Sequence, residues 1–136
     1  MGTWASDTFG NDIACDWGWK AAEQTDLQLV SDKLDEVLAV GDDFLDSELA
    51  AETLAACEVV ARLQGRWGKR NAYSADVDKW IVEHPQRPSE DLIRKAIRAI
   101  DRITAEESEL AEEWDFRGDR TWRASVADLR ARCQGR

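Results

Sequence analysis

The chain has 136 residues, which is long enough for one domain with a modest hydrophobic core. Hydrophobic residues make up 43% of it, which excludes a wholly disordered protein, and 28 acidic against 18 basic residues give a net charge of -10. That charge excludes binding to nucleic acid or an anionic membrane through overall attraction. No apolar run approaches the roughly 20 residues that span a bilayer, and we expect no signal peptide.

The first ten residues combine aromatic side chains with small and polar ones. We expect Met1 to Gly10 to form an ordered, non-helical arm, with Trp4 and Phe9 needing a pocket in the rest of the protein. A helix follows from Asp12 to about Glu23, with apolar residues spaced by four.

Two strongly patterned helices come next. Leucine and valine recur at helical spacing over residues 26–40, and Gly41 supplies a stop. Residues 47–64 carry apolar side chains over about half of the helical wheel, which favours a central helix packed against more than one neighbour. Glu58 and Arg62 fall on the other half of the wheel, with Glu48, Ala51, Glu52 and Ala55.

A basic linker, RWGKRNAY, separates this helix from the next, which we expect over residues 74–82. Trp67 in the linker could anchor the loop or contact nucleic acid, and we favour the anchor. His84 is the only histidine, and its place before a proline is typical of a helix end.

Three further helices complete the pattern, over residues 89–103, 106–115 and from about Trp122 to Cys133. No segment alternates polar and apolar residues as a half-buried strand does. The sequence therefore predicts an all-α protein, a compact bundle of six or seven short helices with the N-terminal arm laid against it.

The helices can be grouped in two ways. We expect a single helical domain over residues 1–136, with division into an acidic half (1–65) and a mixed-charge half (66–136) as the alternative.

The cysteines Cys15, Cys57 and Cys133 are odd in number and widely spaced, unlike a disulfide framework. We expect Cys57 to be a small buried hydrophobic residue, and the protein to reside in a reducing cytoplasm. One histidine cannot support a Cys/His zinc site, and we expect no cofactor.

Charge is distributed unevenly along the chain. Residues 1–60 have a net charge of -12 and residues 61–136 a net charge of +2, with a further acidic cluster at 106–115. Nine acids fall within residues 32–58, about one per 4.5 Å along a helix, a density closer to one strand of DNA than to a duplex.

We take eight of these carboxylates as a candidate surface for a basic partner: Asp32, Asp35, Glu36, Asp42, Asp43, Asp46, Glu48 and Glu52. The alternative is a solvated face that keeps the protein soluble. A pair of like charges one helical turn apart destabilises a helix by only about 0.2–0.5 kcal/mol. The stability of the helices therefore does not decide between a binding surface and a solvated face.

The opening Met1-Gly2-Thr3-Trp4-Ala5, with Phe9, Asn11-Asp12-Ile13-Ala14 and Asp16-Trp17, resembles a bacterial family of small cytoplasmic proteins known only as a domain of unknown function. Its members typically begin MG[AT]W, followed by F-x-N-D-x-A-x-D-W, and Ala5 stands where the family usually has glycine. Matching stretches follow at residues 50–61 and 122–130. The resemblance implies a shared fold and a non-secreted location, without an activity.

We expect a non-enzymatic, monomeric protein that occludes a basic, nucleic-acid-binding surface of a partner and binds neither nucleic acid nor membrane itself. Small acidic inhibitors carried by mobile elements act in this way, including anti-CRISPR proteins that block a Cascade-type complex, which is an analogy from charge and size. An immunity protein that neutralises a toxin is the alternative, because it would be equally acidic.

A third alternative is a small metal-dependent enzyme that uses Asp12 and Asp16, which lie one helical turn apart. No second acidic pair or Glu-x-x-His motif supports it, and helix-capping and surface roles are favoured. The acidic stretch DDFLDSELAAE lacks the residue spacing of a calcium-binding loop.

Overall fold

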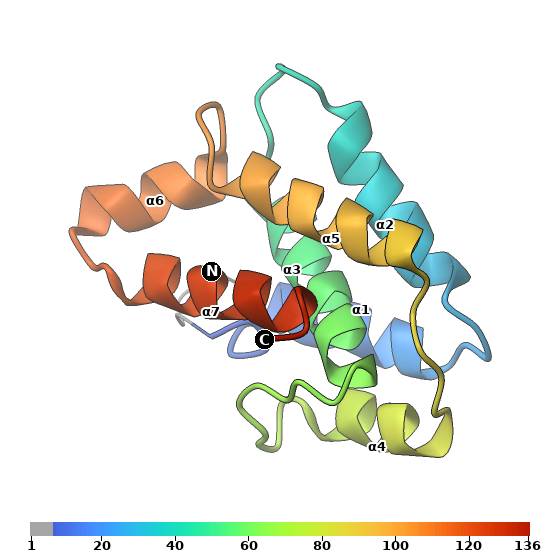
Figure 1. Cartoon of the computed structure of the whole chain (residues 1–136). Helices are drawn as coiled ribbons and strands as arrows, with labels where there is room; N and C mark the ends of the chain where they lie inside the picture. Colours follow the sequence, from blue (N-terminus) through green and yellow to red (C-terminus); the bar gives the residue numbers. More distant parts are fainter. Residues whose placement is uncertain (1–6) are drawn as a thin grey trace.

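The computed structural model describes residues 7–136, over which the regular secondary structure is helical (Figure 1), apart from an isolated bridge between Leu45 and Ser108. The helices are α1 (Asp12–Ala22), α2 (Gln28–Ala39), α3 (Ser47–Leu63), α4 (Ala75–Glu83), α5 (Glu90–Ile103), α6 (Glu109–Arg117) and α7 (Thr121–Cys133). The prediction of an all-α fold is confirmed. The expectations for residues 1–6, including Trp4, lie outside the described residues.

Helix α3 runs through the middle of the molecule and contacts each of the other helices described (Figure 1). Its alanine-rich sequence favours a helix, and the small side chains let several neighbours approach closely. The carboxylate of Asp46 accepts a hydrogen bond from the Leu49 amide (2.8 Å) and caps the first turn. Gly65, at φ 75°, follows the last turn. The prediction of a central helix is confirmed.

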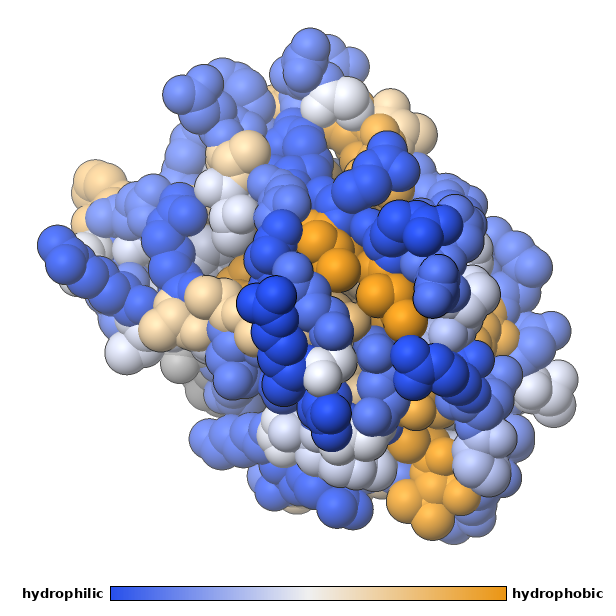
Figure 2. Space-filling view, in the orientation of Figure 1, coloured by the Kyte–Doolittle hydropathy of each residue, from blue (hydrophilic) through white to orange (hydrophobic). Residues whose placement is uncertain are grey.

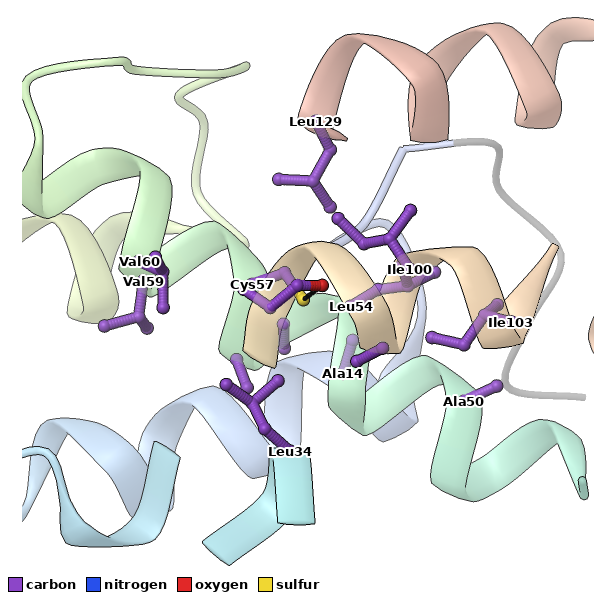
Figure 3. Close-up of a cluster of buried hydrophobic side chains, with 14 of the residues drawn as sticks. Ala14, Leu34, Ala50, Leu54, Cys57, Val59, Val60, Ile100, Ile103 and Leu129 are labelled. Carbon is purple, nitrogen blue, oxygen red and sulfur yellow. Dashed lines mark hydrogen bonds between the residues drawn. The ribbon is translucent and has the colours of Figure 1, made fainter. Parts of the chain in front are cut away.

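The hydrophobic core surrounds α3 and draws on both halves of the sequence. Figure 3 shows Leu54 and Cys57 of α3 in the middle of the cluster, with Ile100 of α5 and Leu34 of α2 on different sides of them, and Val60 further along α3. All of these side chains are buried, which confirms the prediction for Cys57. Its thiol lies 3.6 Å from the Ala96 carbonyl oxygen, and Cys133 donates to the Cys57 carbonyl over 3.4 Å, so α5 and α7 meet α3 here.

Residues 7–10 form a non-helical turn, and the Phe9 side chain is buried in the core. A Cβ atom on Gly18 would lie 3.3 Å from the Phe9 ring and 2.9 Å from Val77 of α4, so glycine allows α1 to approach both. The expected pocket for Phe9 is therefore present, between α1, α4 and α3.

Two helices begin later than the sequence predicts. Asp26 accepts a hydrogen bond from the Gln28 amide (3.0 Å), a local turn that delays the start of α2. The predicted helix over residues 106–115 instead spans Glu109–Arg117, because residues 107–109 hydrogen-bond with Leu45.

One face of the molecule is mostly hydrophilic, with apolar side chains visible where α5 crosses α3 (Figure 2). None of the helices in residues 7–136 has both the length and the hydrophobicity for crossing a bilayer.

Candidate functional site

The linker between α2 and α3 lies against the linker between α5 and α6, at the top of Figure 1. The Leu45 amide donates to the Glu107 carbonyl (2.8 Å), and the Glu109 amide donates to the Leu45 carbonyl (2.9 Å). The Ser47 amide also donates to a carboxylate oxygen of Glu109 (2.8 Å). These hydrogen bonds join two acidic segments that are far apart in the sequence.

Joining the linkers gathers carboxylates from both, and we call this group the acidic end: Asp42, Asp43, Asp46, Glu106, Glu107 and Glu109. Asp46 and Glu109 accept hydrogen bonds from backbone amides. The carboxylates of the other four members are exposed and form no ion pair with any residue of the described range 7–136. They are therefore available to a basic partner.

Arg102 holds the acidic end together through the backbone rather than through its carboxylates. Its guanidinium donates to the carbonyls of Gly41 (2.8 Å), Glu106 (3.1 Å), Glu107 (3.1 Å) and Asp43. Arg102 also lines a hollow of about 490 Å³ between the two linkers. Because its donors are used by carbonyl oxygens, this cation fixes the shape of the acidic end without pairing with its carboxylates.

Glu107 adopts a left-handed backbone conformation with φ 58°. A residue with a side chain adopts this conformation at some energetic cost. Its carbonyl accepts hydrogen bonds from both Leu45 and Arg102, so the contacts of the two linkers hold it there.

On the α2–α3 side, three of the five remaining predicted carboxylates pair with lysines. Lys33 forms ion pairs with Glu36 (3.1 Å) and Glu52 (2.9 Å), and so bridges the two helices. Burial alone would lower the pKa of Lys33, but the hydrogen bonds to the two carboxylates outweigh it and raise that pKa. Asp35 pairs with Lys95 of α5 (2.9 Å). This part of the predicted surface is therefore partly neutralised.

Asp32 and Glu48 complete the predicted set. Both are exposed; Asp32 accepts a hydrogen bond from Gln28 (2.7 Å), and Glu48 forms no ion pair within residues 7–136. The structure thus divides the eight carboxylates into three of the linker (Asp42, Asp43 and Asp46), three helical ones paired with lysines and two helical ones without an ion pair. It adds Glu106, Glu107 and Glu109, which were noted as acidic but not assigned to the surface.

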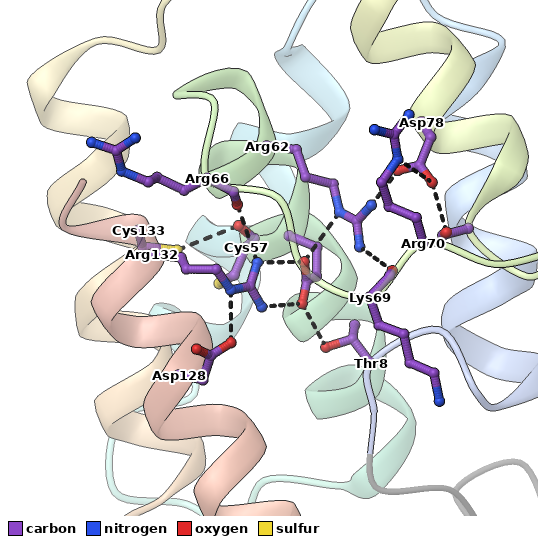
Figure 4. Close-up of polar contacts among 12 residues, drawn as sticks. Thr8, Cys57, Arg62, Arg66, Lys69, Arg70, Asp78, Asp128, Arg132 and Cys133 are labelled. Atoms are coloured by element: carbon purple, nitrogen blue, oxygen red, sulfur yellow. Dashed lines mark hydrogen bonds and ion pairs between the residues drawn. The ribbon is translucent and has the colours of Figure 1, made fainter. Parts of the chain in front are cut away.

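A second cluster of charged residues is buried, and the sequence interpretation missed it. Glu58 and Arg62 lie on the less apolar half of α3, yet they are only 4% and 2% exposed. Figure 4 shows Arg62 between Arg132 of α7 and Asp78 of α4, and Glu58 accepts hydrogen bonds from both arginines. They are buried because charged residues from two other helices cover that face of α3.

Glu58 is the centre of this buried cluster. Arg132 donates two parallel hydrogen bonds to its carboxylate (3.0 and 2.9 Å), and Arg62 (3.2 Å) and Thr8 (3.2 Å) add two more. Burial would lower the pKa of Arg132, but the hydrogen bonds to Glu58 and Asp128 raise it. The Arg132 guanidinium therefore stays charged.

Arg62 extends the cluster towards α4 and the basic linker. It donates to Asp78 and to the Lys69 carbonyl (2.9 Å), while the Ser74 hydroxyl donates to Asp78 (2.7 Å). Trp67 is half-buried against Arg62 and Arg70, whose guanidinium carbons lie 5.7 and 4.2 Å from its ring centre. These contacts agree with the prediction that Trp67 anchors the loop.

A cavity of about 280 Å³ adjoins the buried cluster and is lined by Glu58, Arg62, Arg132 and six other described residues. The lining charges are of both signs, and each of the three side chains is hydrogen-bonded within the protein. The cluster therefore acts as a structural connection between α3, α4 and α7.

The residues of the metal-dependent alternative are exposed on α1. Asp12 and Asp16 have no third ligand beside them: within residues 7–136, no group of three or more histidine, cysteine or acidic residues is placed to hold a metal ion.

The family comparison matches residues 2–125 to a family described as Domain of unknown function (DUF4259). The match covers most of the chain, so the protein belongs to this family. Comparison with curated proteins and with solved structures found no match.

Proposed function

We propose that this protein is a non-enzymatic binding protein whose acidic end occupies a basic, nucleic-acid-binding surface on a partner protein. The observation that carries the proposal is the convergence of two acidic linkers with unpaired carboxylates. A group of negative charges on one end of a protein attracts a basic groove and competes with the phosphates that the groove binds.

The charge balance favours the acidic end over the α2–α3 side as the main contact. Lys33 and Lys95 already pair with Glu36, Glu52 and Asp35, so a partner's cations would have to displace them. Asp42 and Asp43 require no such exchange. In this proposal the acidic end makes the main contact with the partner, and the α2–α3 side makes a secondary one.

The proposal includes the finer expectations from the sequence: a bacterial, cytoplasmic protein and a partner such as a Cascade-type complex, as for an anti-CRISPR protein. The free thiols of Cys15, Cys57 and Cys133 are consistent with a reducing compartment.

The test is displacement of proteins from DNA. A bacterial extract is loaded on DNA-cellulose at low salt, and the column is washed with the purified protein. We expect the wild type to elute one or a few DNA-binding proteins, and elution to weaken steeply as salt increases. An acidic-end variant carrying Asp42→Asn, Asp43→Asn, Glu106→Gln and Glu107→Gln should elute at least about tenfold less, because four charge contacts are lost.

A control variant changes net charge equally at exposed carboxylates elsewhere: Asp12→Asn, Asp16→Asn, Glu90→Gln and Asp91→Asn. It should elute the same proteins as the wild type. Equal elution by the wild type and the acidic-end variant would contradict the proposal, as would the failure of the wild type to displace any protein.

A further inference from the structure

Helices α1 and α4 lie side by side, and a groove opens between them near their C-terminal ends. The helices approach each other closely at Gly18 and Val77, where a Cβ atom on the glycine would lie 2.9 Å from a valine methyl group. Beyond this point they enclose a groove of about 450 Å³, lined by Trp19, Ala22, Glu23, Asp76, Lys79, Trp80 and Glu83. This volume suits a single large side chain with part of its backbone.

Two tryptophans form the apolar part of the groove. Trp19 is 51% exposed, which is unusual for so large an apolar side chain. Trp80 is held in place by its indole N–H, which donates to the Gln24 carbonyl (2.6 Å), and by stacking on His84 with ring centres 4.6 Å apart. One aromatic wall is therefore fixed and the other is open to solvent.

The polar part of the groove is negatively charged. Glu23, Asp76 and Glu83 form no ion pair with any residue in the described part of the chain. Lys79 is the one cation among the lining residues, and its ammonium is likewise unpaired within residues 7–136. The lining thus has three carboxylates against one ammonium.

The backbone adds to this negative potential. Helix α1 ends at Ala22 and α4 ends at Glu83, so the C-terminal ends of both helices border the groove. The last carbonyl groups of a helix carry partial negative charge and favour a cation nearby. Carboxylates, helix C-termini and a tryptophan face all favour the same ligand chemistry, a planar or compact cation.

We propose that the α1–α4 groove binds an arginine side chain presented by a segment of another protein. A guanidinium group stacks on an exposed indole and donates to carboxylates in its own plane, which matches Trp19 flanked by Glu23 and Glu83. The groove lies outside the acidic end, and this proposal does not depend on the proposed function.

The test is a titration followed by two-dimensional ¹H–¹⁵N NMR of the full-length protein. The probe is a blocked Gly-Arg-Gly tripeptide, and the matched probe carries citrulline, the neutral isostere of arginine. We expect the arginine tripeptide to shift the indole N–H signal of Trp19 and the amide signals of Glu23 and Glu83. The citrulline tripeptide should shift them at least about fivefold less, because it lacks the charge.

Substitutions in the groove separate its parts. Trp19→Ala should weaken binding of the arginine tripeptide about fivefold by removing the exposed aromatic wall. Lys79→Met should strengthen it about twofold, because it removes the internal competing cation. If Lys79 had only a structural role, its replacement would not increase the affinity for the arginine tripeptide.

The matched control is Phe116→Ala, which removes another aromatic side chain, 95% exposed on α6, and should leave binding unchanged. The NMR spectrum of each variant reports whether it is folded. Shifts confined to the acidic end would overturn the proposal. Equal binding of the two tripeptides, or unchanged binding by Trp19→Ala, would overturn it as well.

Discussion

At the scale of single residues, the buried charged cluster explains how α7 is attached to α3. Arg132 pairs with Glu58 where both side chains are nearly inaccessible, at 11% and 6% exposed. Taking charges out of water is costly, so such a pair persists where every donor and acceptor is matched. A Cβ atom on Gly68 would lie only 2.8 Å from the Arg132 guanidinium, so the basic linker closes over the pair.

Replacing one partner should therefore be costly. Arg132→Met should lower the free energy of unfolding by about 3 kcal/mol, because Glu58 remains buried with its main cation removed. Arg130→Met is the control on the same helix: its pair with Asp101 is exposed and should cost less than about 1 kcal/mol. Urea denaturation measures both, and equal effects would show that the buried pair has no special role.

The sequence could not reveal this cluster. Glu58 and Arg62 are four residues apart, a spacing that is typical of exposed ion pairs on a helix surface. Their burial depends on Asp78 and Arg132, which lie on helices whose packing against α3 the periodicity does not specify. A helical wheel gives the direction of a side chain but not what covers it.

At the scale of elements, α6 and α7 form a junction built on aromatic and charged contacts. The rings of Trp114 and Trp122 stack with centres 6.5 Å apart and planes 3° from parallel. Gly118, at φ 69°, allows the sharp turn between the helices. Arg123 donates two hydrogen bonds to Asp115 (2.9 and 3.0 Å) and so ties α7 to α6.

This ion pair predicts a dependence of stability on pH. The hydrogen bonds from Arg123 lower the pKa of Asp115 below its ordinary value of 3.8. Its stabilising effect is thus present above pH 3.8 and is lost as the pH falls through the lowered pKa. Asp115→Asn should reduce the Tm at neutral pH by about 1–3 °C, and the melting temperatures of the variant and the wild type should converge as the pH falls through the lowered pKa of Asp115.

The control for that experiment is Asp16→Asn, since Asp16 is exposed and forms no ion pair within residues 7–136. Its Tm should follow the wild type at both pH values. A difference for Asp115→Asn that persists undiminished in acid would mean that the substitution acts by another route than the loss of charge.

Helices were predictable from the sequence where local signals decide them. Ser89 caps α5 through the Leu92 amide (3.1 Å), and His84 follows the last residue of α4. The start of α6 was not predictable, because residues 107–109 hydrogen-bond with Leu45, a partner distant in the sequence. Local propensity cannot anticipate such competition for backbone groups.

At the scale of the whole molecule, the net charge of -10 is concentrated by the fold. The cluster after α5 joins the linker after α2, so repulsion at the acidic end adds to the cost of folding. The composition indicated acidity in both segments, but their meeting depends on hydrogen bonds of Leu45 and Arg102 that no sequence pattern specifies. That part of the candidate site needed the structure.

Repulsion at the acidic end predicts a dependence of stability on salt. At about 10 mM salt the acidic-end variant should melt about 1–3 °C above the wild type, because four like charges have been removed. At about 0.5 M salt, screening should remove most of this difference. Thermal melts followed by circular dichroism measure it, and a variant that melts below the wild type at low salt would contradict the interpretation.

The way in which Arg102 secures two linkers has a consequence for recognition. Its guanidinium donates hydrogen bonds to main-chain carbonyl oxygens of both linkers. The acidic end therefore has the same backbone conformation before and after a partner binds. Binding then costs the acidic end little conformational entropy. The choice of partner would then depend on the rate of association with a positively charged groove. It would depend less on a conformational change of this protein after the encounter.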